Sequence, residues 1–186
     1  MAFDVAAQDA LLRTLHILSG IVWIGHLYFF NLTNLPVFQF AIKNGDPNVK
    51  GGPALIYRAL FWFRWGAMLT LIFGLALFYV HAKEMQMSAT EFMKTSEGTL
   101  IGLGMLLGII MWFNVWFIIW PAQKVVLSNN MAIAKGAAPE EKARMEAQNA
   151  PLAKKAKLAS RTNFWLSIPM LFFMVFAAHG ASILGM

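Results

Sequence analysis

Residues 15–30 read LHILSGIVWIGHLYFF, a stretch that is apolar apart from one serine and two histidines. It is part of a longer apolar segment, about 11–32, and three similar segments follow at about 55–80, 100–120 and 164–184. Each has the ~20 residues that an α-helix needs to cross about 30 Å of hydrocarbon. The sequence therefore predicts an all-α protein, a bundle of four transmembrane helices that forms a single domain over residues 1–186, with a cytoplasmic loop at 121–161.

The composition agrees with a membrane protein. Hydrophobic residues make up 59% of the 186 residues and charged residues only 13%, against roughly 45–50% and about 25% in soluble domains. The leader before the first apolar segment carries Asp4 and Asp9 and no basic residue, whereas a secretory signal peptide needs a positive n-region. We therefore expect the first segment to remain as a permanent membrane helix.

The distribution of Lys and Arg predicts the orientation in the membrane. Residues 121–161 hold eight of the 15 basic residues, and the segment after the last span holds none. Because cytoplasmic loops carry the Lys/Arg excess, we expect both termini on the periplasmic side of a bacterial cytoplasmic (inner) membrane. Since the basic residues flank membrane spans, they indicate contact with the lipid bilayer and no nucleic-acid partner. Within this loop, Pro139 is expected to start a short helix and Pro151 to interrupt it.

All four histidines, His16, His26, His81 and His179, lie in or at the edges of the predicted spans. At ~1.5 Å per residue, His16 and His179 lie at similar depths, roughly 7 Å below the outer edge, and His26 lies ~15 Å deeper. Intramembrane ionisable residues are costly and usually functional, and neutral imidazole is the commonest metal ligand. We therefore expect His16 and His179 to ligate the iron of a haem b. The alternative is a histidine that only hydrogen-bonds a neighbouring helix.

Other residues extend this hypothesis. The absence of cysteine excludes iron–sulfur clusters and the covalent attachment of c-type haem within this chain. Gly20 follows the first histidine by four residues, so a flat ring could lie against the helix there. His81 is an alternative ligand or a partner of a haem propionate, and His26 is a candidate ligand of a second haem. Arg64 either anchors the span by its charge or binds a carboxylate, and Met68 and Met170 are candidate axial partners.

Four segments of the chain together resemble a known family: RTLHILSGIVWIGHLYFFNL, FWFRWGAMLTLIFGLAL, GLGMLLGIIMWFNVWFIIWP and RTNFWLSIPMLFFMVFAAHG. They resemble the membrane domain at the N-terminus of bacterial membrane-bound urate oxidases (urate hydroxylases). More distantly, the four-span plan is similar to membrane haem proteins related to protoporphyrinogen oxidase. The positions that this resemblance reinforces are His16, Gly20, Trp23, Gly25, Trp62, Arg64, Trp65 and His179. The chain departs from the family element at Gly66, where the family has an acid.

Three functions are compatible with these features. The first is a b-type haem subunit that carries electrons to or from a periplasmic c-type cytochrome or a partner complex, an electron-transfer module that need not be an enzyme by itself. The second is copper handling, because HAKEMQM places His81, Met85 and Met87 together and thioethers with imidazole suit Cu(I). The third is a structural subunit of a larger membrane assembly that holds no cofactor.

Overall fold

The computed structural model of the chain describes residues 4–37, 40, 44 and 52–179, with the backbone alone at 52–54, 178 and 179. All of the regular structure in these ranges is helical. In chain order the elements are α1 (Val5–Tyr28), η1 (Phe29–Asn34), α3 (Gly52–Glu84), α4 (Ala89–Phe92), α5 (Ser96–Phe113), η3 (Asn114–Ile119), α6 (Trp120–Ala134) and α7 (Pro139–His179). The two η elements are π-helical turns that continue the helix before them.

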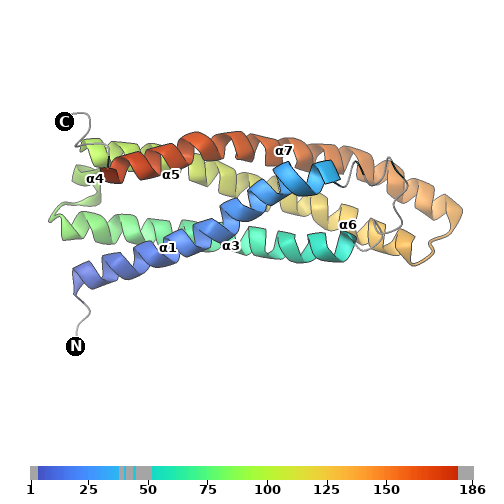
Figure 1. Cartoon of the computed structure of the whole chain (residues 1–186), viewed down its shortest axis with the longest axis horizontal. Coiled ribbons are helices and arrows are strands. Elements are labelled where there is room, and N and C mark those ends of the chain that lie inside the picture. Colours follow the sequence, from blue (N-terminus) through green and yellow to red (C-terminus); the bar gives the residue numbers. More distant parts are fainter. Residues whose placement is uncertain (1–3, 38–39, 41–43, 45–51, 180–186) are drawn as a thin grey trace.

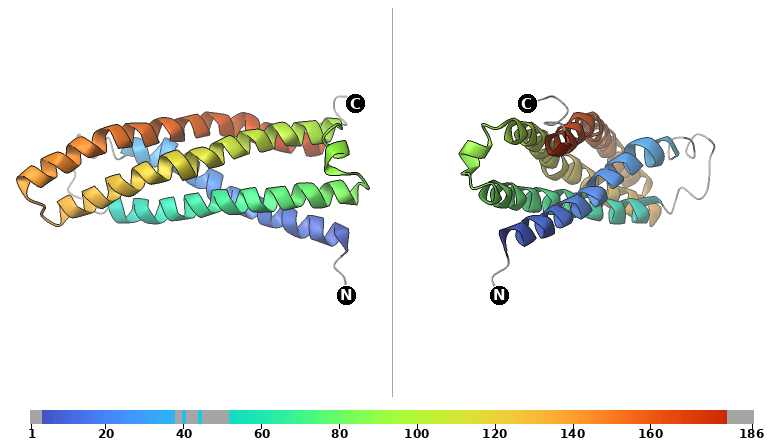
Figure 2. Two further views of the ribbon diagram at one scale, coloured as in Figure 1. Left: turned by 180° about the vertical axis from the view of Figure 1, so that it is seen from behind. Right: turned by 60° about the vertical axis from the view of Figure 1, so that its left-hand side comes forward.

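The long helices lie side by side and form an elongated body (Figure 1). Helix α1 packs mainly on α3, and α7 packs mainly on α5 and α6. Figure 2 shows that α1 crosses the other helices obliquely, so that its beginning lies beside α3 and its end lies near α7. The beginning of α1 and the end of α7 lie at the same end of the molecule, together with α4. The α6–α7 turn lies at the opposite end.

Three helical segments of the described chain are long and apolar enough to cross a membrane, namely Val5–Val37, Leu55–Glu84 and Ser96–Ala134. They correspond to the first three segments expected from the sequence. Large apolar side chains on their outer surface are exposed, including Ile21 at 63% and Tyr79 at 64%. Lipid contact explains this exposure, because hydrocarbon imposes no cost on an exposed apolar side chain.

The core that holds the helices together lies in the middle of the body. Its fully buried members include Leu27, Phe63 and Met111, from α1, α3 and α5. Helices α1 and α3 approach closely at Gly66, where a Cβ atom would lie 3.0 Å from the backbone nitrogen of Trp23. A side chain at Gly66 would therefore collide with the backbone of α1.

Each π-helical turn ends two residues before a proline. Pro36 follows η1, and Pro121 follows η3. A proline inside a helix removes one backbone donor and clashes with the carbonyl four residues earlier. A π turn widens the helix at that point and accommodates the clash.

The segment expected to be a loop, 121–161, is a helical hairpin. Helix α6 extends to Ala134, and α7 begins at Pro139 as predicted, but it continues through Pro151 to His179. The predicted interruption at Pro151 is therefore wrong. Pro151 is exposed, so water can solvate the backbone carbonyl that its ring leaves without a donor.

Candidate functional site

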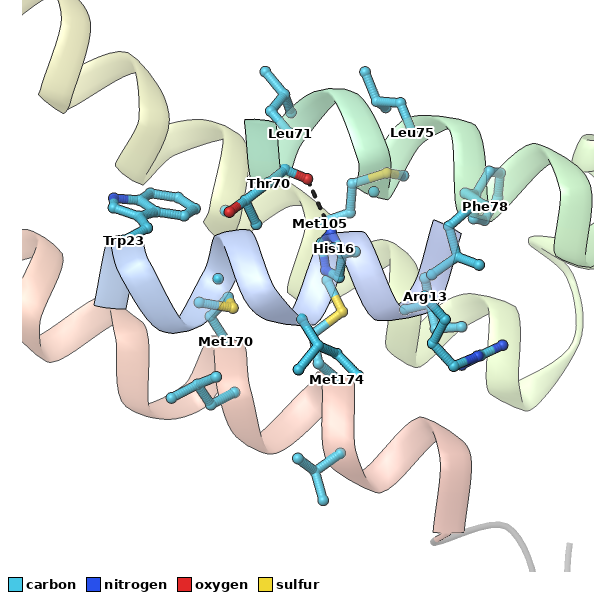
Figure 3. A pocket seen from close by; sticks show the side chains of 18 of the residues that line it. Arg13, His16, Trp23, Thr70, Leu71, Leu75, Phe78, Met105, Met170 and Met174 are labelled. Carbon is cyan, nitrogen blue, oxygen red and sulfur yellow. Dashed lines mark hydrogen bonds between the residues drawn. The ribbon is translucent and has the colours of Figure 1, made fainter. Parts of the chain in front are cut away.

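A large pocket opens between the α1–α3 pair and the helices α5 and α7 (Figure 3). Its volume is about 730 Å³, within the usual range of ligand pockets, about 300–1,000 Å³. The walls are almost entirely apolar. Six of the residues singled out from the sequence line it: His16, Gly20, Trp23, Gly25, His81 and Met170.

His16 lines this pocket, and its hydrogen bonding fixes its chemistry. Its Nδ1 atom lies 2.9 Å from the backbone carbonyl oxygen of Thr70 on α3, as Figure 3 shows. A carbonyl can only accept, so Nδ1 carries the proton and Nε2 keeps its lone pair. Among the described residues Nε2 has no hydrogen-bond partner. A ring whose N–H donates to a backbone carbonyl while the other nitrogen stays available is the usual arrangement of a metal-binding histidine.

Glycines give the pocket its shape. A Cβ atom on Gly74 would lie only 2.8 Å from Cε1 and 2.9 Å from Nδ1 of His16, so the missing side chain at position 74 makes room for the imidazole. Gly20 also lines the pocket, and a Cβ atom there would meet nothing closer than Thr70 Cγ2 at 3.9 Å. Two further lining glycines, Gly25 and Gly108, have nothing within 4 Å. These open positions leave smooth walls that suit a flat ligand.

A charged network lies at the end of the pocket near α4. His81 Nδ1 lies 3.0 Å from Asp9 Oδ1, and His81 Nε2 lies 3.2 Å from Glu97 Oε1. Arg13 makes an ion pair with Asp9 at 2.9 Å and lies 3.3 Å from His81 Nδ1. Arg13, His81 and Glu97 all line the pocket. Both ring nitrogens of His81 thus face carboxylates, and Asp9, His81 and Glu84 bring their ligand atoms within 4.8 Å of one another.

Methionines supply the remaining soft donors. Met105, Met170 and Met174 line the pocket from α5 and α7, and Figure 3 places them around His16. Thioether sulfur is a known axial ligand of haem iron. The pocket thus combines the imidazole of His16 with thioethers and apolar walls.

Other predicted residues lie elsewhere. His26 donates from Nδ1 to the carbonyl of Val22 on its own helix, at 2.7 Å, and does not line the pocket. Arg64 is also outside the pocket, and its guanidinium carbon lies 3.8 Å from the centre of the Trp120 ring. The side chain of His179 falls outside the described residues, so its proposed pairing with His16 stays a prediction.

The sequence analysis missed Thr70 and Gly74, which position His16. Both lie on α3, one helical turn apart, so the absent side chain at 74 exposes the carbonyl of Thr70 on the same face. Their depth in the membrane is a signal that the sequence does contain. The first two spans are antiparallel, so the residue at the level of His16 lies about six positions before the outer end of the second span. That residue is Gly74.

Comparison with known proteins supports a relationship for the larger part of the chain. The family described as urate oxidase N-terminal matches residues 81–185, which is more than half of the 186 residues. The chain belongs to this family. The urate oxidase N-terminal match contains α4 to α7 and two of the histidines, His81 and His179. It begins after His16, Gly20 and Arg64 in the chain. No curated protein and no solved structure gave a significant match.

Proposed function

We propose that the protein is a b-type haem-binding subunit of a bacterial cytoplasmic membrane, which carries electrons to or from a partner protein. The observation that carries this proposal is His16: its Nδ1 atom is committed to Thr70, and its Nε2 atom has no partner in the described structure. The imidazole lines an apolar pocket of about 730 Å³. Iron bound there would supply one-electron redox chemistry, and the protein would supply placement and tuning of the potential.

The residues present fit such a group. His16 offers its Nε2 atom, which has no partner among the described residues, and Trp23, Met105 and Met174 line the walls around it. Arg13 and His81 lie at one end of the pocket, where they could hold the negatively charged propionates. His179 is the proposed second axial ligand, and Met170 or Met174 is the alternative from the same helix.

The proposed topology has four spans, with the end of α7 from Phe164 onward as the fourth and both termini periplasmic. The charge distribution supports it, because the α6–α7 hairpin holds the basic excess at the end opposite α4 and the beginning of α1. The pocket then lies near the periplasmic face, within reach of a periplasmic c-type cytochrome or another subunit of a membrane complex.

Haem content tests the proposal. We expect protein purified in mild detergent to contain b haem by the pyridine haemochrome assay, and His16→Ala to lose it. His26→Ala is the matched control, since this intramembrane histidine on the same helix lies outside the pocket. If both variants keep the wild-type haem content, His16 is not a ligand. If the wild type holds no haem after reconstitution with hemin, the proposal is wrong, and copper handling or a structural role would replace it.

A further inference from the structure

Arg64 has an unusual environment for a cation in a membrane helix. Its guanidinium carbon lies 3.8 Å from the centre of the Trp120 ring, 5.3 Å from that of Trp116 and 5.8 Å from that of Trp65. No carboxylate pairs with it among the described residues. The three rings, here called the tryptophan cage, stabilise the charge by cation–π attraction but accept no hydrogen bonds in the plane of the guanidinium.

The hydrogen-bond donors of this region are left without acceptors. Arg64 Nε is buried and has no partner, and the same holds for Nε1 of Trp116 beside it. A buried donor without an acceptor is costly, and a guanidinium has five N–H groups to satisfy. These two nitrogens are enclosed by the protein, but the Arg64 side chain as a whole is only partly buried, so an acceptor from outside the protein can reach the terminal nitrogens of the guanidinium.

The level of this cage in the membrane identifies the acceptor. Arg64 lies 17 residues before His81 on α3, or about 25 Å towards the end that carries the basic hairpin. Trp120 starts α6, and Tyr57 packs on it with ring centroids 6.3 Å apart. Trp and Tyr gather at the headgroup level, and long basic side chains reach the same level. At the headgroup level, the anion that can approach Arg64 from the surrounding bilayer is the phosphate of a phospholipid.

We infer that Arg64 and its tryptophan cage form a binding site for the phosphate of a phospholipid in the leaflet at the α6–α7 end. The guanidinium would donate to the phosphate oxygens in its own plane. The exposed rings of Phe61 and Trp65, at 42% and 40%, would contact the acyl chains. This site is distinct from the haem pocket, which Arg64 does not line.

Native mass spectrometry with phosphatidylglycerol as the probe tests the inference. We expect the wild type to retain one lipid molecule, and Arg64→Gln to bind it at least tenfold more weakly. Arg58→Gln is the matched control, because Arg58 is an exposed cation on the same helix without a ring contact, and we expect less than a twofold change. Inorganic phosphate at the same concentration should not displace the lipid, because it brings no acyl chains to the rings.

Several results would overturn the inference: a wild type that retains no lipid, equal retention by Arg64→Gln, an equal loss in Arg58→Gln, or displacement by inorganic phosphate. If Arg64→Gln does not fold, Arg64→Lys replaces it. Lysine keeps the positive charge but lacks the planar guanidinium, so Arg64→Lys should bind the lipid more weakly than the wild type. Unchanged lipid binding would contradict a role for the planar guanidinium. Haem content should stay at the wild-type value in every variant, which separates this test from that of the proposed function.

Discussion

Replacement of Gly74 by alanine should move the imidazole of His16. The new Cβ atom would lie 2.8 Å from Cε1 in the present arrangement, and carbon atoms pack at about 3.5–4.0 Å. The ring must therefore retreat by about 0.7 Å or more, which strains or breaks its 2.9 Å hydrogen bond to Thr70. Overpacking of this kind costs about 1–3 kcal/mol. Loss of an outer hydrogen bond to a metal ligand costs about 10–100-fold in metal affinity.

The matched control is Gly108→Ala. Gly108 lines the same pocket from α5, and a Cβ atom there meets nothing within 4 Å. Both replacements gain the helix preference of alanine, roughly 0.5–1 kcal/mol, so their difference isolates the collision. We expect thermal unfolding in detergent to show Gly74→Ala about 1–3 kcal/mol less stable than Gly108→Ala, and hemin titration to show about 10–100-fold weaker binding. Equal stability and equal hemin affinity in the two variants would refute the placement of His16 against Gly74.

Three further predictions concern the pocket, the core and α4. Gly20→Leu should fill part of the pocket and lower the hemin affinity without loss of helicity, as circular dichroism and hemin titration would show. Asn163→Ala should destabilise the protein by about 1–3 kcal/mol in thermal unfolding, because buried Asn163 accepts from Asn114 at 2.8 Å and donates to Met111 at 2.9 Å. Asn129→Ala, at a half-buried position, should cost less. At the start of α4, Ser88 and Glu91 form a capping box, in which each side chain accepts a hydrogen bond from the backbone N–H of the other residue. The Ser88 hydroxyl and then the Ser88 N–H lower the pKa of Glu91. The capping box should therefore be complete above the ordinary carboxyl pKa and should open as the pH falls through the lowered pKa of Glu91. An NMR titration in which Ser88→Ala leaves the pKa of Glu91 unchanged would contradict this.

The sequence predicted the helical class because apolar segments of membrane length are an unambiguous signal. It also singled out His16 and Gly20 together, because residues four apart lie on one helix face, and both line the pocket. Thr70 and Gly74 were missed because their role depends on contact between two helices, and a glycine carries no chemical signal of its own.

The helical hairpin at 121–161 was missed for a different reason. Its helices meet through amides, with Asn129 and Asn130 hydrogen-bonded to Asn149 at 2.9 Å. Hydropathy gives no sign of such a polar contact, so the segment was interpreted as a loop.

The central claim is that His16 Nε2 is an iron ligand in the pocket, and chemical rescue tests it most directly. His16→Gly removes the imidazole but leaves its space, so free imidazole can take its place. We predict that the optical spectrum of the hemin-reconstituted variant lacks the low-spin bands of the wild type and that added imidazole restores them. Added imidazole should leave the spectrum of His26→Gly unchanged. A His16→Gly variant with the wild-type spectrum before any imidazole is added would contradict the account.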